Sequence, residues 1–252
     1  MNRKTSPAIL SRILHLVRTE TAVLGGLLVV ALGVWVFAGL ADETGEAGGQ
    51  AFDRAVLMAM RPNPDPSDAW GPAWLQVAAG DITALGGIAV LGLFAMIAIG
   101  FLLIQKKRLS ALLLVLGLAG GVALSEVLKG VFERVRPPEA FQAVETVNAS
   151  FPSGHALLST VFYLTVGVML ARTLPRRRLK TFVLAAAVLI AVLVGLTRVY
   201  LAAHWATDVL AGWSVGATWA MCLWLVADMV GRWSVSGETG QNTGSAPPAD
   251  PK

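Results

Sequence analysis

Long apolar stretches separated by short polar breaks make up most of this chain. Stretches of about 20 residues, each long enough to cross a bilayer core of ~30 Å as a helix, lie at 21–40, 84–104, 109–130, 154–173, 181–200 and 208–231. The boundary between the last two is ambiguous, because residues 202–208 suit either a loop or a helix start. The pattern predicts an all-α fold: a polytopic membrane helix bundle with six transmembrane helices.

The composition agrees with this pattern. Of the 252 residues, 55% are hydrophobic and only 14% are charged, and the mean hydropathy is +0.65. A soluble domain of this size would need more charge to cover its surface. The single cysteine, Cys222, excludes a disulfide within the chain and lies inside an apolar stretch.

The chain divides into four predicted parts. Residues 1–20 form a basic cytoplasmic segment that includes a short surface helix, and residues 21–83 hold the first span and an amphipathic loop on the outer face. Residues 84–231 form a core with five spans. Residues 232–252, rich in Gly, Ser, Thr, Pro and Asn, are expected to be a disordered cytoplasmic tail.

Two groups of apolar residues in the 41–83 loop fall on helical faces. They are Phe52, Val56, Leu57 and Met60, and then Trp70, Trp74 and Val77. Such faces suit helices lying at the bilayer surface, with Trp at the level of the headgroups. Packing against neighbouring spans is the alternative, and the sequence does not decide between them.

The distribution of Lys and Arg residues predicts the orientation of the chain in the membrane. With six spans, 14 of the 20 basic residues fall on one side, in the N-terminal segment, at 106–108, at 172–180 and in the C-terminal tail. This bias predicts that both termini are cytoplasmic and that the 41–83 loop is outside. The six exceptions on the outer side are Arg54, Arg61, Lys129, Arg134, Arg136 and Arg198.

A polar island, Asn148–His155, separates two of the apolar stretches. Pro152 and Ser153 end a loop, and Gly154 and His155 open the next helix. The start of a helix presents unpaired N–H groups and the positive end of its dipole, which suits an anion. Ser153 could equally be an ordinary helix cap.

Other ionisable residues lie at helix ends on the same predicted face. His204 and Asp208 are spaced i, i+4, so one helical turn lets the carboxylate meet the imidazole. Ionisable groups at membrane depth are costly and mark functional sites. Alternatively, a cationic side chain near a helix end can extend to the lipid headgroups, and this explanation suits Arg54, Arg61 and Arg134.

This set of residue types fits phosphoryl transfer. A neutral His oriented by a carboxylate is a competent nucleophile, and a second, protonated His can deliver a proton to a leaving oxygen. Lys129, Arg136 and Arg198 supply cationic donors for phosphoryl oxygens. A metal site is the weaker alternative, because Asp208 is the only carboxylate with suitable spacing. We therefore expect no metal and no cofactor.

Three motifs carry a family resemblance. Lys129-x6-Arg136-Pro137, Pro152-Ser153-Gly154-His155 and Arg198-x5-His204-x3-Asp208 resemble the signature of the type-two phosphatidate phosphatase superfamily. That superfamily includes lipid phosphate phosphatases, undecaprenyl-diphosphate phosphatases, glucose-6-phosphatase and vanadium haloperoxidases. The resemblance covers about residues 85–230, and Thr197 stands where the third motif commonly begins with Ser.

The resemblance implies a role for each motif residue. His204 would attack phosphorus and form a phosphohistidine, Asp208 would orient His204, and His155 would protonate the leaving group and then activate water. The phosphate oxygens would be held by Lys129, Arg136, Ser153, Gly154 and Arg198. The family does not need a metal.

The sequence thus predicts a membrane phosphatase, in the inner membrane of a bacterium, acting at the outer face on a lipid phosphate or diphosphate. Undecaprenyl diphosphate and phosphatidate or phosphatidylglycerophosphate are the expected substrate types, and nothing points to a nucleic acid partner. Transfer to an acceptor other than water and a non-catalytic lipid binder or transporter stay open as alternatives. The oligomeric state and the role of the 41–83 loop cannot be read from the sequence.

Overall fold

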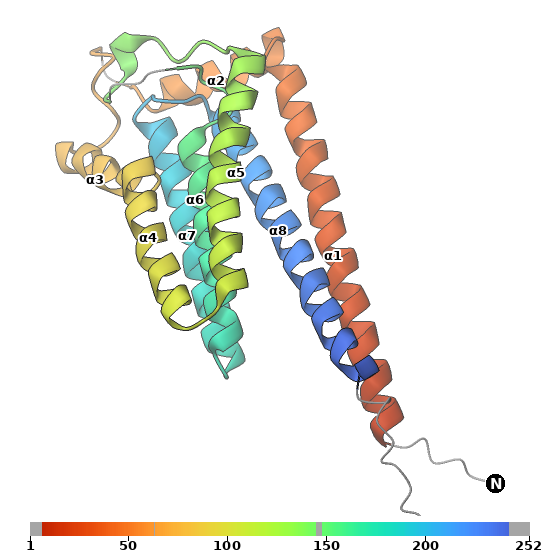
Figure 1. The fold of residues 1–252 in the computed structure, drawn as a ribbon. Coiled ribbons are helices and arrows are strands. Elements are labelled where there is room, and N and C mark those ends of the chain that lie inside the picture. Colours follow the sequence, from red (N-terminus) through yellow and green to blue (C-terminus); the bar gives the residue numbers. More distant parts are fainter. Residues whose placement is uncertain (1–6, 63, 145–147, 242–252) are drawn as a thin grey trace, which may run out of the picture.

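The structure is a computed structural model that describes residues 7–62, 64–144 and 148–241, and these residues form helices and no strand (Figure 1). The helices are α1 (Pro7–Glu43), α2 (Ala47–Ala59), α3 (Ala73–Ala84), α4 (Ile88–Ile104), α5 (Arg108–Phe132), the 3-10 helix η1 (Glu139–Phe141), α6 (Gly154–Thr173), α7 (Arg177–Tyr200) and α8 (Ala206–Gln241). The all-α prediction is confirmed for the described part of the chain.

Helix α6 is the centre of the bundle and packs against α5, α7 and α8, while α1 runs along α8. The core is formed by apolar side chains from α4, α5, α6 and α8, among them Leu91, Leu114, Leu157 and Val215. Figure 1 shows α1 and α8 side by side, diverging from α4–α7 towards the end of the bundle where α1 begins. The loops that join α5 to α6 and α7 to α8 lie together at the opposite end.

Five helices in the described residues are long and apolar enough to cross a membrane, and there are six if a bent pair is counted as one span. That pair is α3 and α4, which meet at a 45° bend. The predicted span at 84–104 is therefore the shorter helix α4, which a break at residues 85–87 separates from α3. The predicted start of α6 at Gly154 agrees with the structure.

Close helix packing depends on small residues. A Cβ atom at Gly212 would lie 2.7 Å from the Ser153 carbonyl oxygen, and one at Gly216 would lie 2.7 Å from the Leu157 carbonyl oxygen. Both distances are shorter than van der Waals contact, so only glycine allows α8 to lie this close to α6. The small-residue spacing therefore sets the distance between the two helices that carry Asp208 and His155.

The ends of the chain differ from the prediction. Helix α1 runs unbroken from Pro7, so the basic segment is not a separate surface helix. Helix α8 continues to Gln241, so residues 232–241 of the predicted disordered tail are helical. No proline interrupts either helix after Pro7, so both can continue beyond the apolar stretches. The rest of the predicted tail, 242–252, lies outside the described residues.

The two amphipathic faces of the 41–83 loop have different environments. Helix α2 buries Leu57, which is 4% exposed, and packs Val56 and Met60 against a small cluster formed by Ala156, Val199 and Val209. Trp70, Trp74 and Val77, in and just before α3, are 62–67% exposed. Packing thus explains Val56, Leu57 and Met60 of the first group, whereas Phe52 is 50% exposed. The second group remains a candidate for the bilayer surface.

Candidate active site

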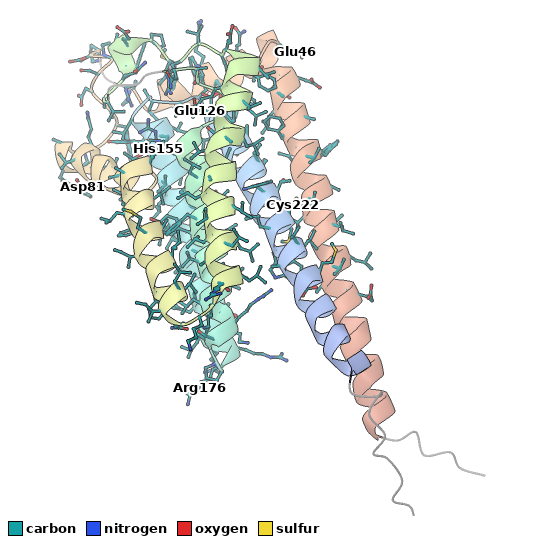
Figure 2. The ribbon with its side chains drawn as sticks, in the orientation of Figure 1. Glu46, Asp81, Glu126, His155, Arg176 and Cys222 are labelled. Carbon is teal, nitrogen blue, oxygen red and sulfur yellow. The ribbon has the colours of Figure 1, made fainter. Side chains whose placement is uncertain are left out.

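The structure brings the predicted site residues to one end of the bundle. Lys129 lies in the last turn of α5 and Arg198 in the last turn of α7, while Gly154 and His155 open α6 and Asp208 lies in the first turn of α8. Arg136 and His204 lie in the connecting loops. Figure 2 shows His155 and Glu126 at this end, with Arg176 at the opposite one. These residues meet because consecutive helices run antiparallel, so the ends of α5 and α7 lie beside the starts of α6 and α8.

The start of α6 faces a cation. The Ser153 hydroxyl caps the helix by accepting the Ala156 amide at 3.4 Å, and the Ser153 amide donates to the Asp208 carbonyl at 2.9 Å. A Cβ atom at Gly154 would lie 3.6 Å from the Lys129 ammonium nitrogen. The amino terminus of α6 and Lys129 therefore present positive potential to the same space, which suits a dianion.

His204 is 3% exposed and lies between an arginine and a carboxylate. Its Nε2 is 3.3 Å from Nη1 of Arg136, and its Nδ1 is 3.5 Å from Oδ2 of Asp208. A guanidinium can only donate, so the contact with Arg136 is a hydrogen bond in the tautomer that has its lone pair on Nε2 and its proton on Nδ1, on the side of Asp208. Burial lowers the pKa of His204 to about 4 from its ordinary 6.5, although Asp208 opposes this. The ring is thus neutral at physiological pH.

Arg136 forms hydrogen bonds with two loops of the site. Its Nε donates to the Asn148 carbonyl at 2.8 Å, and its Nη1 donates to the Ala203 carbonyl at 2.6 Å. The loop before α6 and the loop that carries His204 are therefore held by one guanidinium. Arg136 also borders a cavity of about 890 Å³ lined by residues of the 134–148 loop.

Asp208 is held by a network that sequence reasoning missed. It accepts hydrogen bonds from the Ser150 hydroxyl and the Trp205 amide, and Arg134 Nη1 donates to its Oδ1 at 2.6 Å. Arg134 Nη2 pairs at 2.7 Å with Asp53 of α2. The predicted snorkelling of Arg134 to headgroups is wrong, because two buried carboxylates bind its guanidinium.

Asp53 is itself fixed from α8. It is 2% exposed, and its carboxylate accepts the Thr207 amide at 2.9 Å and the Thr207 hydroxyl at 2.6 Å. A signal for Asp53 existed in the sequence, since it lies at helical spacing on the same face as Val56, Leu57 and Met60. An acidic residue within an apolar stripe requires a buried partner.

Arg61 has a structural role, so its predicted snorkelling is also wrong. It is 5% exposed and donates to four backbone carbonyls, those of Met60, Pro66, Phe141 and Tyr200, at 2.9–3.0 Å. These bonds tie the loop after α2 to η1 and to the end of α7. Arg54, the third residue expected to snorkel, is exposed.

The bend between α3 and α4 borders the site. Arg198, 6% exposed, donates from Nη1 to the Thr83 hydroxyl at 3.3 Å, and its Nε has no hydrogen-bond partner among the described residues. A Cβ atom at Gly87 would lie 3.8 Å from Nε2 of His155. Helix α3 thus contributes a hydroxyl, and the bend after it lies directly beside His155.

The charged groups act on one another. Lys129, Arg136 and Arg198 all lie close enough to His155 for their charges to influence it. Three cations and two histidines around one helix start form a site for an anion that can react with a neutral imidazole. In the part of the chain that the structure describes, no group of three or more His, Cys, Asp or Glu residues is arranged to hold a metal ion. Thr197, at the position that is commonly Ser, donates its hydroxyl to the Val194 carbonyl of its own helix.

Comparisons with known proteins define the class. A model of the PAP2 superfamily matches residues 110–232. Phosphatidylglycerophosphatase B of Bacillus subtilis (strain 168) is 34% identical over 173 residues, covering 68% of this chain and 79% of the relative. The chain therefore belongs to the PAP2 superfamily, and the resemblance inferred from its three motifs is confirmed.

Two further comparisons support the assignment. An undecaprenyl-diphosphatase of Sulfolobus acidocaldarius is 32% identical over 121 residues, which cover 46% of this chain and 54% of that protein. The crystal structure of a transmembrane PAP2-type phosphatidylglycerolphosphate phosphatase from Bacillus subtilis superposes with a TM-score of 0.73 at 30% identity, covering 80% of this chain and 96% of that one. Together with its apolar helices, this likeness makes the chain an integral membrane protein.

Proposed function

We propose that this chain is a lipid phosphatase that hydrolyses a lipid phosphate or diphosphate through a phosphohistidine intermediate on His204. The observation that carries the proposal is the arrangement of His204, which is 3% exposed and has Nδ1 3.5 Å from Oδ2 of Asp208 and Nε2 3.3 Å from Nη1 of Arg136. Relatives named as phosphatases of phosphatidylglycerophosphate and undecaprenyl diphosphate support the substrate class. We propose these two lipid types, or phosphatidate, as substrates.

The reaction has two steps. Nε2 of His204 attacks phosphorus in line with the leaving oxygen, and His155 donates a proton to that oxygen as the P–O bond breaks. His155 then removes a proton from water, which attacks the phosphohistidine and releases inorganic phosphate. Asp208 holds the Nδ1 proton of His204 and balances the positive charge that the ring gains.

Charge stabilisation lowers the barrier of both steps. Lys129, Arg136 and Arg198 bind the non-bridging oxygens, and the Ser153 hydroxyl and Gly154 amide add donors at the start of α6. The lipid tails lie between helices in the outer half of the bilayer. The basic segments 106–108 and 172–180 and both termini lie in the cytoplasm, and the chain crosses the membrane six times if α3 and α4 count as one span. The site therefore opens to the exterior of a bacterial inner membrane.

Phosphate release by the purified chain tests the proposal. The assay uses undecaprenyl diphosphate, phosphatidate and phosphatidylglycerophosphate in detergent with EDTA. His204→Ala is expected to abolish release, and Arg136→Ala or Arg198→Ala to lower the rate by about 100-fold or more. His15→Ala, the same change in α1 away from the motifs, is the matched control. Wild-type rates from His204→Ala would refute the nucleophile.

His155→Ala separates the two steps. With a substrate whose leaving group needs no proton, this variant should still form the phosphohistidine but should hydrolyse it slowly. An acid-labile, base-stable phosphoenzyme should therefore accumulate, detectable by mass spectrometry. Labelling of a residue other than His204 would contradict the mechanism.

The resting state of His204 can be measured directly. Nitrogen-15 NMR of the histidine-labelled chain should show His204 as the Nδ1-protonated tautomer, with a titration midpoint at about 4. The pKa is lowered because burial disfavours the charged ring, so the neutral form persists to lower pH. His204→Asn assigns the signal. A midpoint near the ordinary 6.5 would mean that the ring is not held as the structure has it.

A further inference from the structure

A large cavity lies in the half of the bundle far from the candidate active site. Its volume is about 1200 Å³, and it is bordered by α1, α4, α5, α6 and α8, where the α1–α8 pair diverges from the other helices (Figure 1). The volume exceeds the ~300–1,000 Å³ of pockets for drug-sized ligands. The walls are apolar and include Phe101, Leu114, Leu164, Val168 and Leu223.

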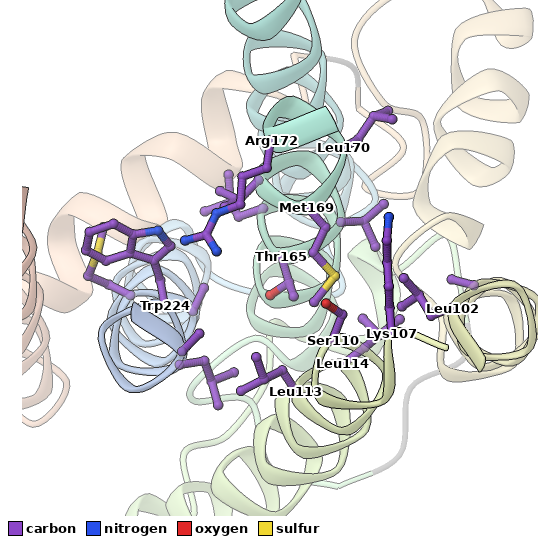
Figure 3. A pocket seen from close by; sticks show the side chains of 18 of the residues that line it. Leu102, Lys107, Ser110, Leu113, Leu114, Thr165, Met169, Leu170, Arg172 and Trp224 are labelled. Carbon is purple, nitrogen blue, oxygen red and sulfur yellow. The ribbon is translucent and has the colours of Figure 1, made fainter. Parts of the chain in front are cut away.

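Polar groups gather at one end of this cavity. Lys107 directly precedes α5, and Arg172 lies in the last turn of α6, with Ser110 and Trp224 nearby in the lining. Figure 3 shows the Arg172 side chain extending towards Trp224. Within the described residues, neither cation forms a salt bridge with a carboxylate. Two cations that have no carboxylate partner among the described residues, beside an apolar cavity, fit a ligand that has both an anionic group and an apolar body.

The hydroxyl group of Thr165 is a further polar group in the cavity. The Thr165 hydroxyl oxygen is buried and makes no hydrogen bond in the part of the chain that the structure describes. Thr165 lines the cavity (Figure 3). A buried hydroxyl without a partner is costly, and a ligand that reaches into the cavity could supply the missing acceptor.

We propose that this cavity binds one anionic phospholipid of the leaflet opposite to the active site. The acyl chains fill the apolar cavity, and the phosphate and its charged headgroup lie between Lys107 and Arg172. Basic pockets between transmembrane helices bind anionic headgroups in this way. The lipid closes the space between the α1–α8 pair and the rest of the bundle, and it thereby stabilises the fold.

This lipid is distinct from a substrate. Helix α6 has 20 residues, so its two ends lie about 30 Å apart. A phosphate bound at Gly154 cannot reach Arg172. An anionic group between Lys107 and Arg172 must therefore belong to another molecule. The proposal holds whichever lipid the active site takes.

Lipid binding to the purified full chain in detergent tests the proposal. The probes are phosphatidylserine and phosphatidylcholine, because neither is a phosphate monoester or the product of hydrolysing one. Two cations near the surface contribute about 1 kcal/mol each, so phosphatidylserine should bind about 30-fold more tightly. Native mass spectrometry should show one retained phosphatidylserine, and thermal unfolding should shift upwards with it.

Charge variants locate the headgroup. The double variant Lys107→Gln/Arg172→Gln should bring the preference for phosphatidylserine close to one. The matched control, Arg177→Gln/Arg178→Gln, removes the same charge from the start of α7, which does not line the cavity. It should keep most of the preference. Equal losses in the two double variants would overturn the proposal, because they would mean that general surface charge attracts the lipid.

A steric variant tests the acyl-chain site. Gly25 lines the cavity, and a Cβ atom there would meet nothing within 4 Å. Gly25→Leu should fill the space without a clash and weaken binding of both lipids. Gly39→Leu is the control, since Gly39 lies on the same helix with equally open surroundings but outside the cavity. Unchanged lipid retention in a folded Gly25→Leu variant would also overturn the proposal.

Discussion

Helices α2 and α3 come from the same segment between α1 and α4, and each carries an apolar face in the sequence, yet the protein uses them differently. Helix α2 docks through Leu57 and through Asp53, both almost fully buried. The α3 region leaves Trp70, Trp74 and Val77 exposed. The difference shows that apolar spacing alone does not decide whether such a helix packs against the bundle or stays exposed.

Charge makes the difference. The carboxylate of Asp53 reaches Asp208 through Arg134, so α2 is part of the network that fixes the partner of His204. In the described part of the chain, helix α3 contacts the site through the Thr83 hydroxyl, and the bend that follows it lies beside His155. Helix α2 is linked to Asp208 by buried ion pairs through Arg134. Helix α3 is linked to Arg198 by the hydrogen bond of Thr83.

Removing the charge of Asp53 should have the largest effect. Asp53→Asn keeps the shape but leaves Arg134 facing an amide group, and breaking a buried pair in this way costs about 3 kcal/mol. We expect a lower unfolding temperature in detergent and a lower rate of phosphate release. Asp81→Asn on α3 is the control, because Asp81 is exposed and should change stability by less than about 0.5 kcal/mol. Equal unfolding temperatures for the two variants would remove the distinction between the helices.

An intermediate effect is expected at Thr83. Thr83→Val removes the hydroxyl that accepts from Arg198 while keeping the side-chain shape, and hydrogen bonds to charged groups contribute about 1.5–3 kcal/mol. We expect kcat/KM to fall about tenfold, with little change in unfolding temperature. Thr83→Ser should restore activity, because it restores the acceptor. If Thr83→Val has wild-type kinetics, α3 has no part in positioning Arg198.

Much of this could be predicted from the sequence. The apolar stretches located the long helices, and the motifs placed His155, His204 and Asp208 at helix ends on one face. These signals are local, since each depends on spacing within one segment. The helix ends beyond the apolar stretches were missed, because a helix outside the membrane continues until something such as proline stops it.

The network around Arg134 could not be predicted in the same way. Its partners, Asp53 and Asp208, are 155 residues apart in the chain, and only the docking of α2 brings them together. Arg134 resembled a snorkelling cation because its position near a helix end suits that role equally well. The informative residue was Asp53, whose place in an apolar stripe indicated a buried partner without identifying it.

The smallest effect on activity is expected from labels that report where each helix lies. In a Cys222→Ala background, a nitroxide at Val77→Cys on α3 should be reached by oxygen more than by a water-soluble nickel complex, because Trp70 and Trp74 beside it suit the bilayer interface. A nitroxide at Ala55→Cys, on the exposed face of α2, should show the opposite preference. Both variants should retain phosphate release, since neither side chain is buried. If the label at Val77 were reached mainly by the nickel complex, its exposed apolar face would lie in water, and a protein partner rather than lipid would have to explain it.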